Sequence, residues 1–369
     1  IWDSTFSLVA DTLYYFSELD SGSANGNATL LQDKQTIVAD RIEYIQLPEV
    51  DGVSYAARGN VSITEEGRLA TCGEAIYDRE NGKTVLRITP EIIDNNQTIA
   101  GDEIYLEYDD DVLKNLFIPK DAHVTHASSG IREWTEIIDA DTTLFQDSLT
   151  FSDDMTGSIM RGFFKDGKLD SMRLEGMATT LYHIFEDSVY QGKNEASGDT
   201  IILQFGKDEL ERIFVSGGSR GTYTPDTTGA DMDGPIHYQS EDIDYDVANE
   251  FTNLHGDATI DYTNVNLHAG FINVAWSNNL LKALPESKRD TSYGRIRPEM
   301  IEAGKDPMIG DSIVYNLATR HGKIVRGKTK AEDGFYHGKE IRNQDSDVFY
   351  IEDAIYPTCD LDEPHFHFK

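Results

Sequence analysis

The stretch GDSIVYNL, residues 310–317, decides the fold because the chain repeats its pattern many times. Each copy has a small or polar residue, an acidic residue, a variable residue, and then two apolar residues one position apart. The copies are ADTLYY from Ala10, ADRIEY from Ala39, GDEIYL from Gly101, QDSLTF from Gln146, GDTIIL from Gly198 and SEDIDY from Ser240, with looser forms CGEAIY from Cys72 and HGKEIR from His337. A globular enzyme has little reason to repeat one strand in this way, whereas a stack of similar units does.

Apolar and polar residues alternate along most of the chain, which predicts short β-strands with one wet face. In GDATIDYTNVNLHAGFINVAW, from Gly256, the alternation runs through Ile260 and Tyr262, turns at Thr263-Asn264, and resumes. ENGK (80–83) and KDGK (165–168) carry the Asn-Gly and Asp-Gly pairs of tight hairpin turns. A second motif opens strands at GNAT, GNVS, GMAT and GDAT, which start at Gly26, Gly59, Gly176 and Gly256. The spacing of the two motifs predicts a unit of roughly 28 to 34 residues.

The bulk composition excludes some classes of partner. The 369 residues carry a formal net charge of −34, so the chain should repel nucleic-acid phosphates and anionic membrane surfaces. A saline habitat would also account for the excess of acidic residues. No apolar run approaches the roughly 18 residues of a membrane helix. The first residue is Ile1, and we expect a mature or trimmed product that has lost an export signal.

Two stretches interrupt the alternation. Residues 128–143, SSGIREWTEIIDADTT, are predicted to form a short helix or a joint between modules. Residues 285–307 are polar, contain proline and are locally basic, and we expect a long loop with one helical turn around 299–303.

Three motifs could mark reactive or metal-binding sites. GGSRG (217–221) matches the G-x-S-x-G nucleophile elbow, but TYTP follows it where a helix is needed, so a glycine-rich hairpin turn is favoured. DMDG (231–234) lacks the remaining oxygen ligands of a calcium loop and is interpreted as an acidic turn. CDLDEPHFHF (359–368) carries His-x-His, which on a strand could hold a metal, yet a strand end with surface histidines is favoured. We therefore predict no catalytic set, no metal and no cofactor.

The repeated acids are predicted to be structural. Ile37 and Ala39 precede Asp40, and Ile42 and Tyr44 follow it out of phase, so the inward face of the strand switches there. A bulge at such a point leaves a backbone N–H unpaired, and the carboxylate could accept it. The same role is expected of Asp102, Asp199 and Asp311.

The last third of the chain resembles a known family. GKIVRGKT, DGFYHGKEI and YIEDAIYPTCDLDEPHF, all within residues 310–369, resemble the periplasmic region of the LptD/OstA family of lipopolysaccharide assembly proteins. Residues 155–185 resemble the OstA-like proteins of Bacteroidetes-type bacteria, and residues 57–83 resemble the LptA/OstA repeat. The resemblance thus extends over nearly the whole chain.

The resemblance implies an all-β fold, an elongated β-jellyroll of stacked antiparallel strands in two facing sheets. It implies OstA-like repeats over residues 1–127 and a second, continuous LptD-like module over residues 128–369, with no membrane barrel in this chain. It also implies a non-enzymatic conduit in the periplasm, associated with the outer membrane, that holds the acyl chains of lipopolysaccharide or a related lipid between its sheets. The implied partners are LptA-like bridge components and an outer-membrane barrel with its LptE-like subunit. Family members typically join the cysteine matching Cys359 to one in the barrel.

Alternation on consecutive strands selects the apolar side chains that would line such a path. They are Val61, Ile63, Ile104, Leu106, Ile243, Tyr245, Ile260, Leu267, Ile272, Val274, Trp276, Ile313 and Tyr315. If the two sheets close, these residues are an ordinary core, and if the sheets part, they form a trough for acyl chains.

Two alternatives stay open at this point. One is an enzyme, a right-handed β-helix that acts on acidic polysaccharide, for which a mostly parallel strand pairing would be evidence. The other is a structural surface or filament protein with a closed, dry core. In a linear stack, Cys72 and Cys359 should lie too far apart for a disulfide.

Overall fold

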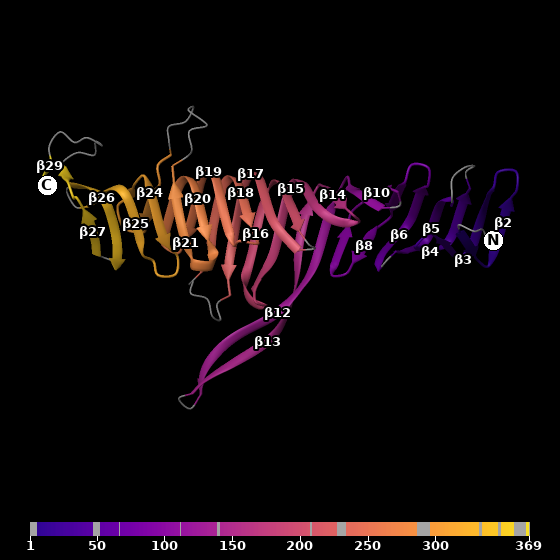
Figure 1. The fold of residues 1–369 in the computed structure, drawn as a ribbon, viewed down its shortest axis with the longest axis horizontal. Helices are drawn as coiled ribbons and strands as arrows, with labels where there is room; N and C mark the ends of the chain where they lie inside the picture. The colour runs from indigo at the N-terminus through magenta and orange to yellow at the C-terminus, as the bar shows by residue number, and fades with distance from the viewer. Residues whose placement is uncertain are drawn as a thin grey trace. The chain divides into compact units, whose positions relative to one another are not determined.

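The computed structural model describes residues 6–46, 52–65, 67–110, 112–138, 141–206, 209–226, 234–285, 296–331, 334–345, 348–357 and 367–368. This part of the chain is almost entirely β-strand (Figure 1) and contains one short 3₁₀-helix, η1 (Trp276–Asn278). No helix among these residues is long and apolar enough to cross a membrane.

The strands of the described residues are numbered in chain order. The first half of the chain contains β1 (Phe6–Val9), β2 (Thr12–Phe16), β3 (Ser21–Gln32), β4 (Gln35–Ile45), β5 (Ser54–Glu65), β6 (Arg68–Asp78), β7 (Lys83–Arg87), β8 (Glu91–Asp94), β9 (Gln97–Ala100), β10 (Glu103–Asp109), β11 (Val112–Ile118), β12 (Ala122–Ile138), β13 (Asp141–Gly157), β14 (Ile159–Lys165) and β15 (Lys168–Glu186). The second half contains β16 (Val189–Gly206), β17 (Glu209–Pro225), β18 (Ile236–Asp246), β19 (Phe251–Tyr262), β20 (Val265–Ala275), β21 (Leu280–Leu284), β22 (Glu299–Glu302), β23 (Met308–Ile309), β24 (Ser312–Asn316), β25 (Gly322–Ala331), β26 (Gly334–Asp345), β27 (Val348–Glu352), β28 (Tyr356–Pro357) and β29 (His367–Phe368).

The chain forms two compact units. Unit 1 comprises residues 1–129, 150–180 and 202–209, and unit 2 comprises residues 130–149, 181–201 and 210–369. The module boundary between residues 127 and 128 stays a prediction.

The long strands of unit 1 each contribute to two layers. Strand β6 pairs through Leu69–Thr71 with β8 and through Glu74–Asp78 with β7, so its two halves belong to different layers. The register between β4 and β5 also breaks in the middle, between Val38 and Arg41. Figure 1 shows β3, β4, β5 and β6 in succession within this unit. A strand that bends at its middle and then resumes pairing builds a two-layered stack from consecutive hairpins.

The bends bring the two sequence motifs together. Gly59 and Asn60 have φ of +76° and +47°, which carries the strand around the corner. An ideal Cβ on Gly59 would lie 2.4 Å from Asp40 Oδ2, so only glycine leaves room for the carboxylate. Asn60 Nδ2 in turn donates to Asp40 Oδ2 at 2.9 Å. Equivalent contacts join Asp11 to Gly26, Asp199 to Gly217 and Glu241 to Gly256.

The predicted switch of the inward face at Asp40 is confirmed, because Ile37, Ala39, Ile42 and Tyr44 are all buried while Asp40 is exposed. The partner of its carboxylate differs from our expectation: it is the side-chain amide of Asn60 and not a backbone N–H. The physical reason is that the bulge places Asn60, in the left-handed region, directly beside the acid.

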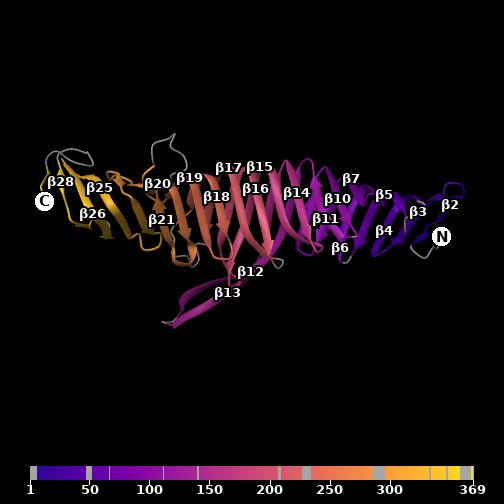
Figure 2. The same ribbon diagram turned by 45° about the horizontal axis from the view of Figure 1, so that its top comes forward.

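Unit 2 repeats the two-layered construction. Strand β20 pairs through Phe271–Ala275 with β21 and through Val265–His268 with β22. The register between β19 and β20 shifts between His255 and Ala258, at the positive-φ residues Gly256 and Asp257. Figure 2 shows β18, β19, β20 and β21 in succession. The predicted all-β fold of stacked antiparallel strands is confirmed.

The pairing direction removes one alternative. The strand pairs of the described residues are antiparallel, as between β4 and β5 or β18 and β19, apart from the parallel pair of Ile131 with Val189. A right-handed β-helix is built from parallel coils, so the polysaccharide-active β-helix enzyme is wrong.

Three local predictions are wrong. Residues 128–138 and 141–143 belong to strands β12 and β13, so the short helix expected there is wrong, while the alternative of a joint between modules stays a prediction. Residues Glu299–Glu302 form strand β22, which pairs with β20 in place of a helical turn. GGSRG is not a hairpin turn but lies inside β17, at a corner where Gly217 and Gly218 have positive φ.

Candidate functional site

The predicted lining side chains lie in the interior. Twelve of the thirteen are buried, namely Val61, Ile63, Ile104, Leu106, Ile243, Tyr245, Ile260, Leu267, Ile272, Val274, Ile313 and Tyr315. Trp276 is only partly buried: its ring lies 4.9 Å from that of Tyr223 and its Nε1 donates to Thr252 Oγ1 at 2.8 Å. Strict alternation therefore identified the inward face of these strands, while their role in holding lipid stays a prediction.

In unit 2, several of the predicted side chains line a very small pocket. Ile260, Leu267 and Tyr315 from the predicted set line it, together with Tyr262, Val265, Leu281, Met300 and Leu317. Its volume is about 10 Å³, hardly one water molecule. This pocket is too small for an acyl chain, so a lipid at this point would require the layers to separate.

Several interior residues were not selected from the sequence. Leu30, Ile37, Ile42, Leu86 and Ile118 are fully buried in unit 1, and Met160, Met172 and Leu174 are fully buried in strands β14 and β15. Ile37 and Ile42 were already placed on the inward face around Asp40 but were left out of the lining set, and the same alternation would have found Leu30.

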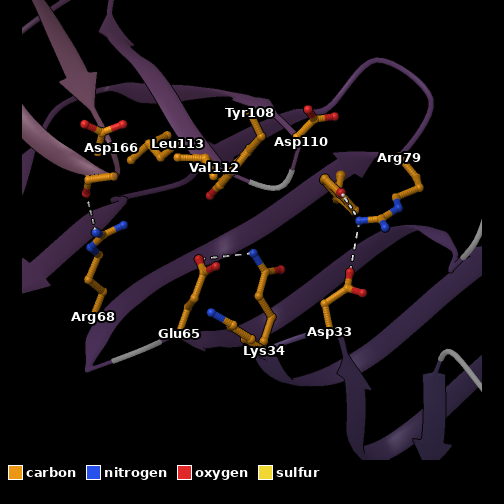
Figure 3. A pocket seen from close by; sticks show the side chains of 13 residues that line it. Asp33, Lys34, Glu65, Arg68, Arg79, Tyr108, Asp110, Val112, Leu113 and Asp166 are labelled. Carbon is orange, nitrogen blue, oxygen red and sulfur yellow. Dashed lines mark hydrogen bonds and ion pairs between the residues drawn. The ribbon is translucent and has the colours of Figure 1, made fainter.

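The open edge of unit 1 carries a polar pocket, shown in Figure 3. We call this edge the mouth: it is where the hairpin turns that end one layer face the turns that end the other, opposite the glycine corners. The pocket has a volume of about 390 Å³ and is lined by Asp33, Lys34, Gln35, Glu65, Arg68, Tyr77, Arg79, Tyr108, Asp110, Val112, Leu113, Asp166 and Gly167.

Polar contacts cross the mouth from layer to layer. Arg79 Nη1, at the end of β6, lies 2.9 Å from Asp33 Oδ2 in the turn between β3 and β4. Arg68 Nη2, at the start of β6, donates to the carbonyl oxygen of Gly167 at 2.8 Å. Deeper in, the buried Gln32 accepts a hydrogen bond from the backbone N–H of Val53 at 2.7 Å.

Aromatic and aliphatic side chains form the inner side of this pocket. Tyr77 and Leu113 are buried, and Tyr77 Oη lies 3.0 Å from Arg79 Nη1. Burial raises the pKa of Tyr108, so its phenol is neutral at physiological pH. The lining of the pocket is thus charged at the rim and neutral or apolar inside.

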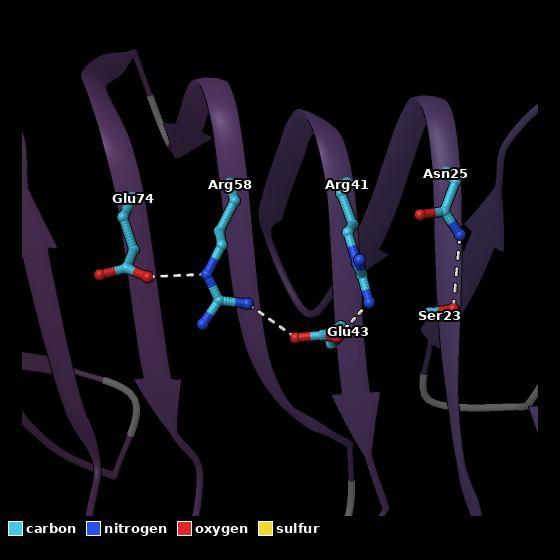
Figure 4. A network of polar contacts seen from close by, with 6 residues as sticks. All are labelled: Ser23, Asn25, Arg41, Glu43, Arg58 and Glu74. Atoms are coloured by element: carbon cyan, nitrogen blue, oxygen red, sulfur yellow. Dashed lines mark hydrogen bonds and ion pairs between the residues drawn. The ribbon is translucent and has the colours of Figure 1, made fainter.

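The outer face of unit 1 carries a separate charged network, shown in Figure 4. Arg58 lies between Glu43 and Glu74, at 2.7 Å and 2.8 Å, and Arg41 is paired with Glu43 as well. The Arg58 guanidinium holds the pKa of the Glu43 carboxyl below its usual range. These side chains are solvated, and their arrangement is that of ordinary cross-strand pairs.

The reactive motifs do not form a catalytic site in the described residues. Ser219 of GGSRG is buried, and its hydroxyl donates to the carbonyl oxygen of Glu241 at 3.1 Å, within a strand corner. DMDG lies outside the described residues apart from Gly234, and so does most of CDLDEPHFHF, including Cys359. Among the residues that the structure describes, no group of three or more His, Cys, Asp or Glu side chains could hold a metal ion.

Residues 8–112 match the family model described as LptA/(LptD N-terminal domain) LPS transport protein. This stretch is similar to the LptA/LptD N-terminal-domain family over somewhat less than a third of the chain. The match covers β2 to β10 and most of the corners and mouth residues of unit 1 described above. The resemblance to the LptA/OstA repeat is therefore confirmed for this region.

The whole chain was also compared with curated proteins and with solved structures. No curated protein matches the chain. Among solved structures, the chain is similar to LptH of Pseudomonas aeruginosa, the LptA homologous periplasmic component of the lipopolysaccharide transport device, with 13% identity and a TM-score of 0.27. That similarity covers 29% of this chain and 79% of LptH. The fold assignment depends on the strand pairing and not on this superposition.

Proposed function

We propose that the chain is a non-enzymatic conduit that carries lipopolysaccharide, or a related lipid, through the periplasm to the outer membrane. The main support for this proposal is the apolar interior of the two-layered stack, on a chain whose residues 8–112 match the model of a lipopolysaccharide transport family. The acyl chains would occupy the space between the layers once these part, and each buried methylene would contribute about 0.8 kcal/mol. The sugar and phosphate groups would stay in water.

Equivalent apolar positions on consecutive strands support movement along the stack. In unit 2, Ile260 pairs with Leu267 and Leu254 pairs with Ile272 on the adjacent strands β19 and β20. A chain that leaves one such pair meets a chemically similar one on the next strand. Transfer between them therefore needs no large change in solvation free energy.

The implied partners are an LptA-like bridge component and an outer-membrane barrel with its LptE-like subunit. Strand β2 of unit 1 presents Tyr14, Tyr15 and Phe16 to solvent, each more than half exposed. An added strand of a bridge component could pair with such an edge, and the aromatic rings would supply apolar contact area. A photo-crosslinking residue at Tyr14 that captures no LptA-like protein in cells would contradict this contact.

The conduit is tested by photo-crosslinking in cells that make lipopolysaccharide. The reactive residue is placed at Val274, which is buried, and separately at its neighbour Asn273, whose side chain lies on the other face and contacts Asn253. We expect lipid adducts at Val274 and not at Asn273. Equal labelling at both, or none at any inward position of a folded protein, would overturn the conduit.

A structural or filament protein is the second candidate, favoured by the very small volume of the pocket in unit 2. Lipid extraction of protein purified from its host separates the two functions. A filament protein should contain no lipid, whereas the conduit should release acylated material in amounts comparable with the protein.

A further inference from the structure

The two edges of unit 1 are closed in different ways. At the corners, the backbone itself passes from one layer to the other, and glycines such as Gly26 and Gly59 hold acids in contact with the turn. At the mouth, the layers are joined by side chains, through the Arg79–Asp33 ion pair and the bond from Arg68 to Gly167. The covalent backbone holds the layers together at the corners, so only the mouth can widen while every strand stays intact.

We propose that this mouth is a side entrance, through which the acyl chain of an amphiphile enters the interior, and that the Arg79–Asp33 and Arg68–Gly167 contacts keep it closed. This inference rests on the proposed function and adds to it the route by which lipid is loaded. The pocket is the place where the polar head and the acyl chain of one molecule would meet during entry.

The contacts that close the mouth can exchange with water. The side chain of Asp33 is 42% exposed, whereas that of Arg79 is 13% exposed. Ion pairs with one solvated partner stabilise a structure weakly, because water replaces the lost interaction. Arg68 can keep its second partner, Asp94 at 3.1 Å, while it releases the Gly167 carbonyl. Opening therefore leaves each charged group with either water or a remaining partner.

The lining of the pocket points to the kind of head group that it accepts. Lys34, Arg68 and Arg79 carry positive charge, while Asp33, Glu65, Asp110 and Asp166 carry negative charge. A mixed set of donors and acceptors offers hydrogen-bond partners to a polyhydroxyl head group, such as the sugar part of the proposed lipid. Tyr77, Tyr108 and Leu113 then continue inward toward the core, where an acyl chain would follow.

The test measures the rate of lipid uptake by the full chain. The probe is a lysophosphatidylcholine with a fluorescent polyene acyl chain, mixed with protein in a stopped-flow instrument. In the variant Asp33→Asn with Arg79→Gln, we expect uptake and release both to become about fivefold faster, the effect of removing a weak ion pair from the barrier. The matched control is Arg58→Gln, which breaks the contacts with Glu43 and Glu74 on the outer face and should leave both rates unchanged.

A second variant locks the mouth. Lys34→Cys and Asp110→Cys are introduced into a Cys359→Ser background and joined by a short bismaleimide, since both residues line the pocket. Cys72 is buried and should not react. We expect the linked protein to take up probe about tenfold more slowly than the same variant capped with N-ethylmaleimide.

The outcomes separate the two proposals. Unchanged rates in both the loosened and the locked variant, with normal binding by the wild-type chain, would overturn the side entrance and leave the conduit standing. A wild-type chain that binds no probe and yields no lipid on extraction would overturn the conduit and the entrance with it.

Discussion

Asp40 and Gly59 are in contact across a strand corner, and an ideal Cβ on Gly59 would lie 2.4 Å from Asp40 Oδ2. Because Gly59 also has a φ of +76°, we expect Gly59→Ala to lower the free energy of unfolding by about 2 to 3 kcal/mol, from backbone strain and steric overlap together. Urea unfolding followed by circular dichroism measures the loss.

Gly67→Ala is the matched control for this corner. Gly67 also has positive φ, at +94°, but no atom lies within 4 Å of the position that an alanine Cβ would take there. Its substitution should therefore cost about 1 kcal/mol, the strain alone. The double variant Asp40→Ala with Gly59→Ala should recover part of the loss, and equal costs for Gly59→Ala in both backgrounds would show that the carboxylate is not the cause.

Asp311→Ala should lower stability by about 1 kcal/mol through loss of its charged hydrogen bonds. Asp311 Oδ1 lies 3.1 Å from Arg297 Nη2, and its other oxygen is paired with Arg326. The acid is thus a structural residue of unit 2. A variant with unchanged melting but abolished lipid transport would contradict this role, and thermal unfolding beside the photo-crosslinking assay distinguishes the two results.

Stability should fall in alkaline solution because buried tyrosines cannot ionise in the folded chain. Burial raises the pKa of Tyr315 to about 12 from a usual value of about 10. The folded state favours the neutral phenol, so its contribution is complete below pH of about 10 and is lost as pH rises from about 10 to 12. In Tyr315→Phe, urea unfolding should depend less steeply on pH across this window, and an identical slope would contradict the prediction.

Cys72 should resist alkylation in the folded protein. It is a free, buried thiol on β6, and burial raises its pKa to about 11. At pH 8 only about one thiol in a thousand would be ionised, and the thiolate is the reactive form. In a Cys359→Ser background, mass spectrometry should detect iodoacetamide labelling only after urea is added. Rapid labelling of the native protein would mean that this strand opens readily.

Alternation predicts those parts of the fold in which one face is buried and the other is solvated. Ile260 and Leu267 were identified in this way, whereas the Gly-Asn pair at residues 59–60, expected to open a strand, lies at a corner inside β5. The strand residues 128–138 and 141–143 were missed because much of this stretch is exposed on both faces, as at Thr143, so no apolar period exists there; the QDSLTF repeat later in β13 was recognised. Strand β22 has only four residues, too few to distinguish a strand from a helical turn.

The mouth could not be predicted because its partners come from separate turns. Arg79 and Asp33 are 46 positions apart and meet only because the register of the intervening hairpins brings two layer edges together. Each residue alone is an ordinary charged residue beside a turn. The contacts at the corners were easier to anticipate from the sequence than those at the mouth, since an acid and a glycine each recur at related spacings.

The register shift at each corner has a consequence for how this chain tolerates change. On a straight strand, one inserted or deleted residue reverses the inward and outward positions of everything that follows. Here, the shifts between Val38 and Arg41 and between Arg58 and Val61 restart the alternation partway along each strand. A length change in one half-strand therefore alters the facing of a few residues and ends at the next corner. Such a stack can accumulate insertions in its units independently, while each glycine and acid pair restores the correct phase for the strand beyond it.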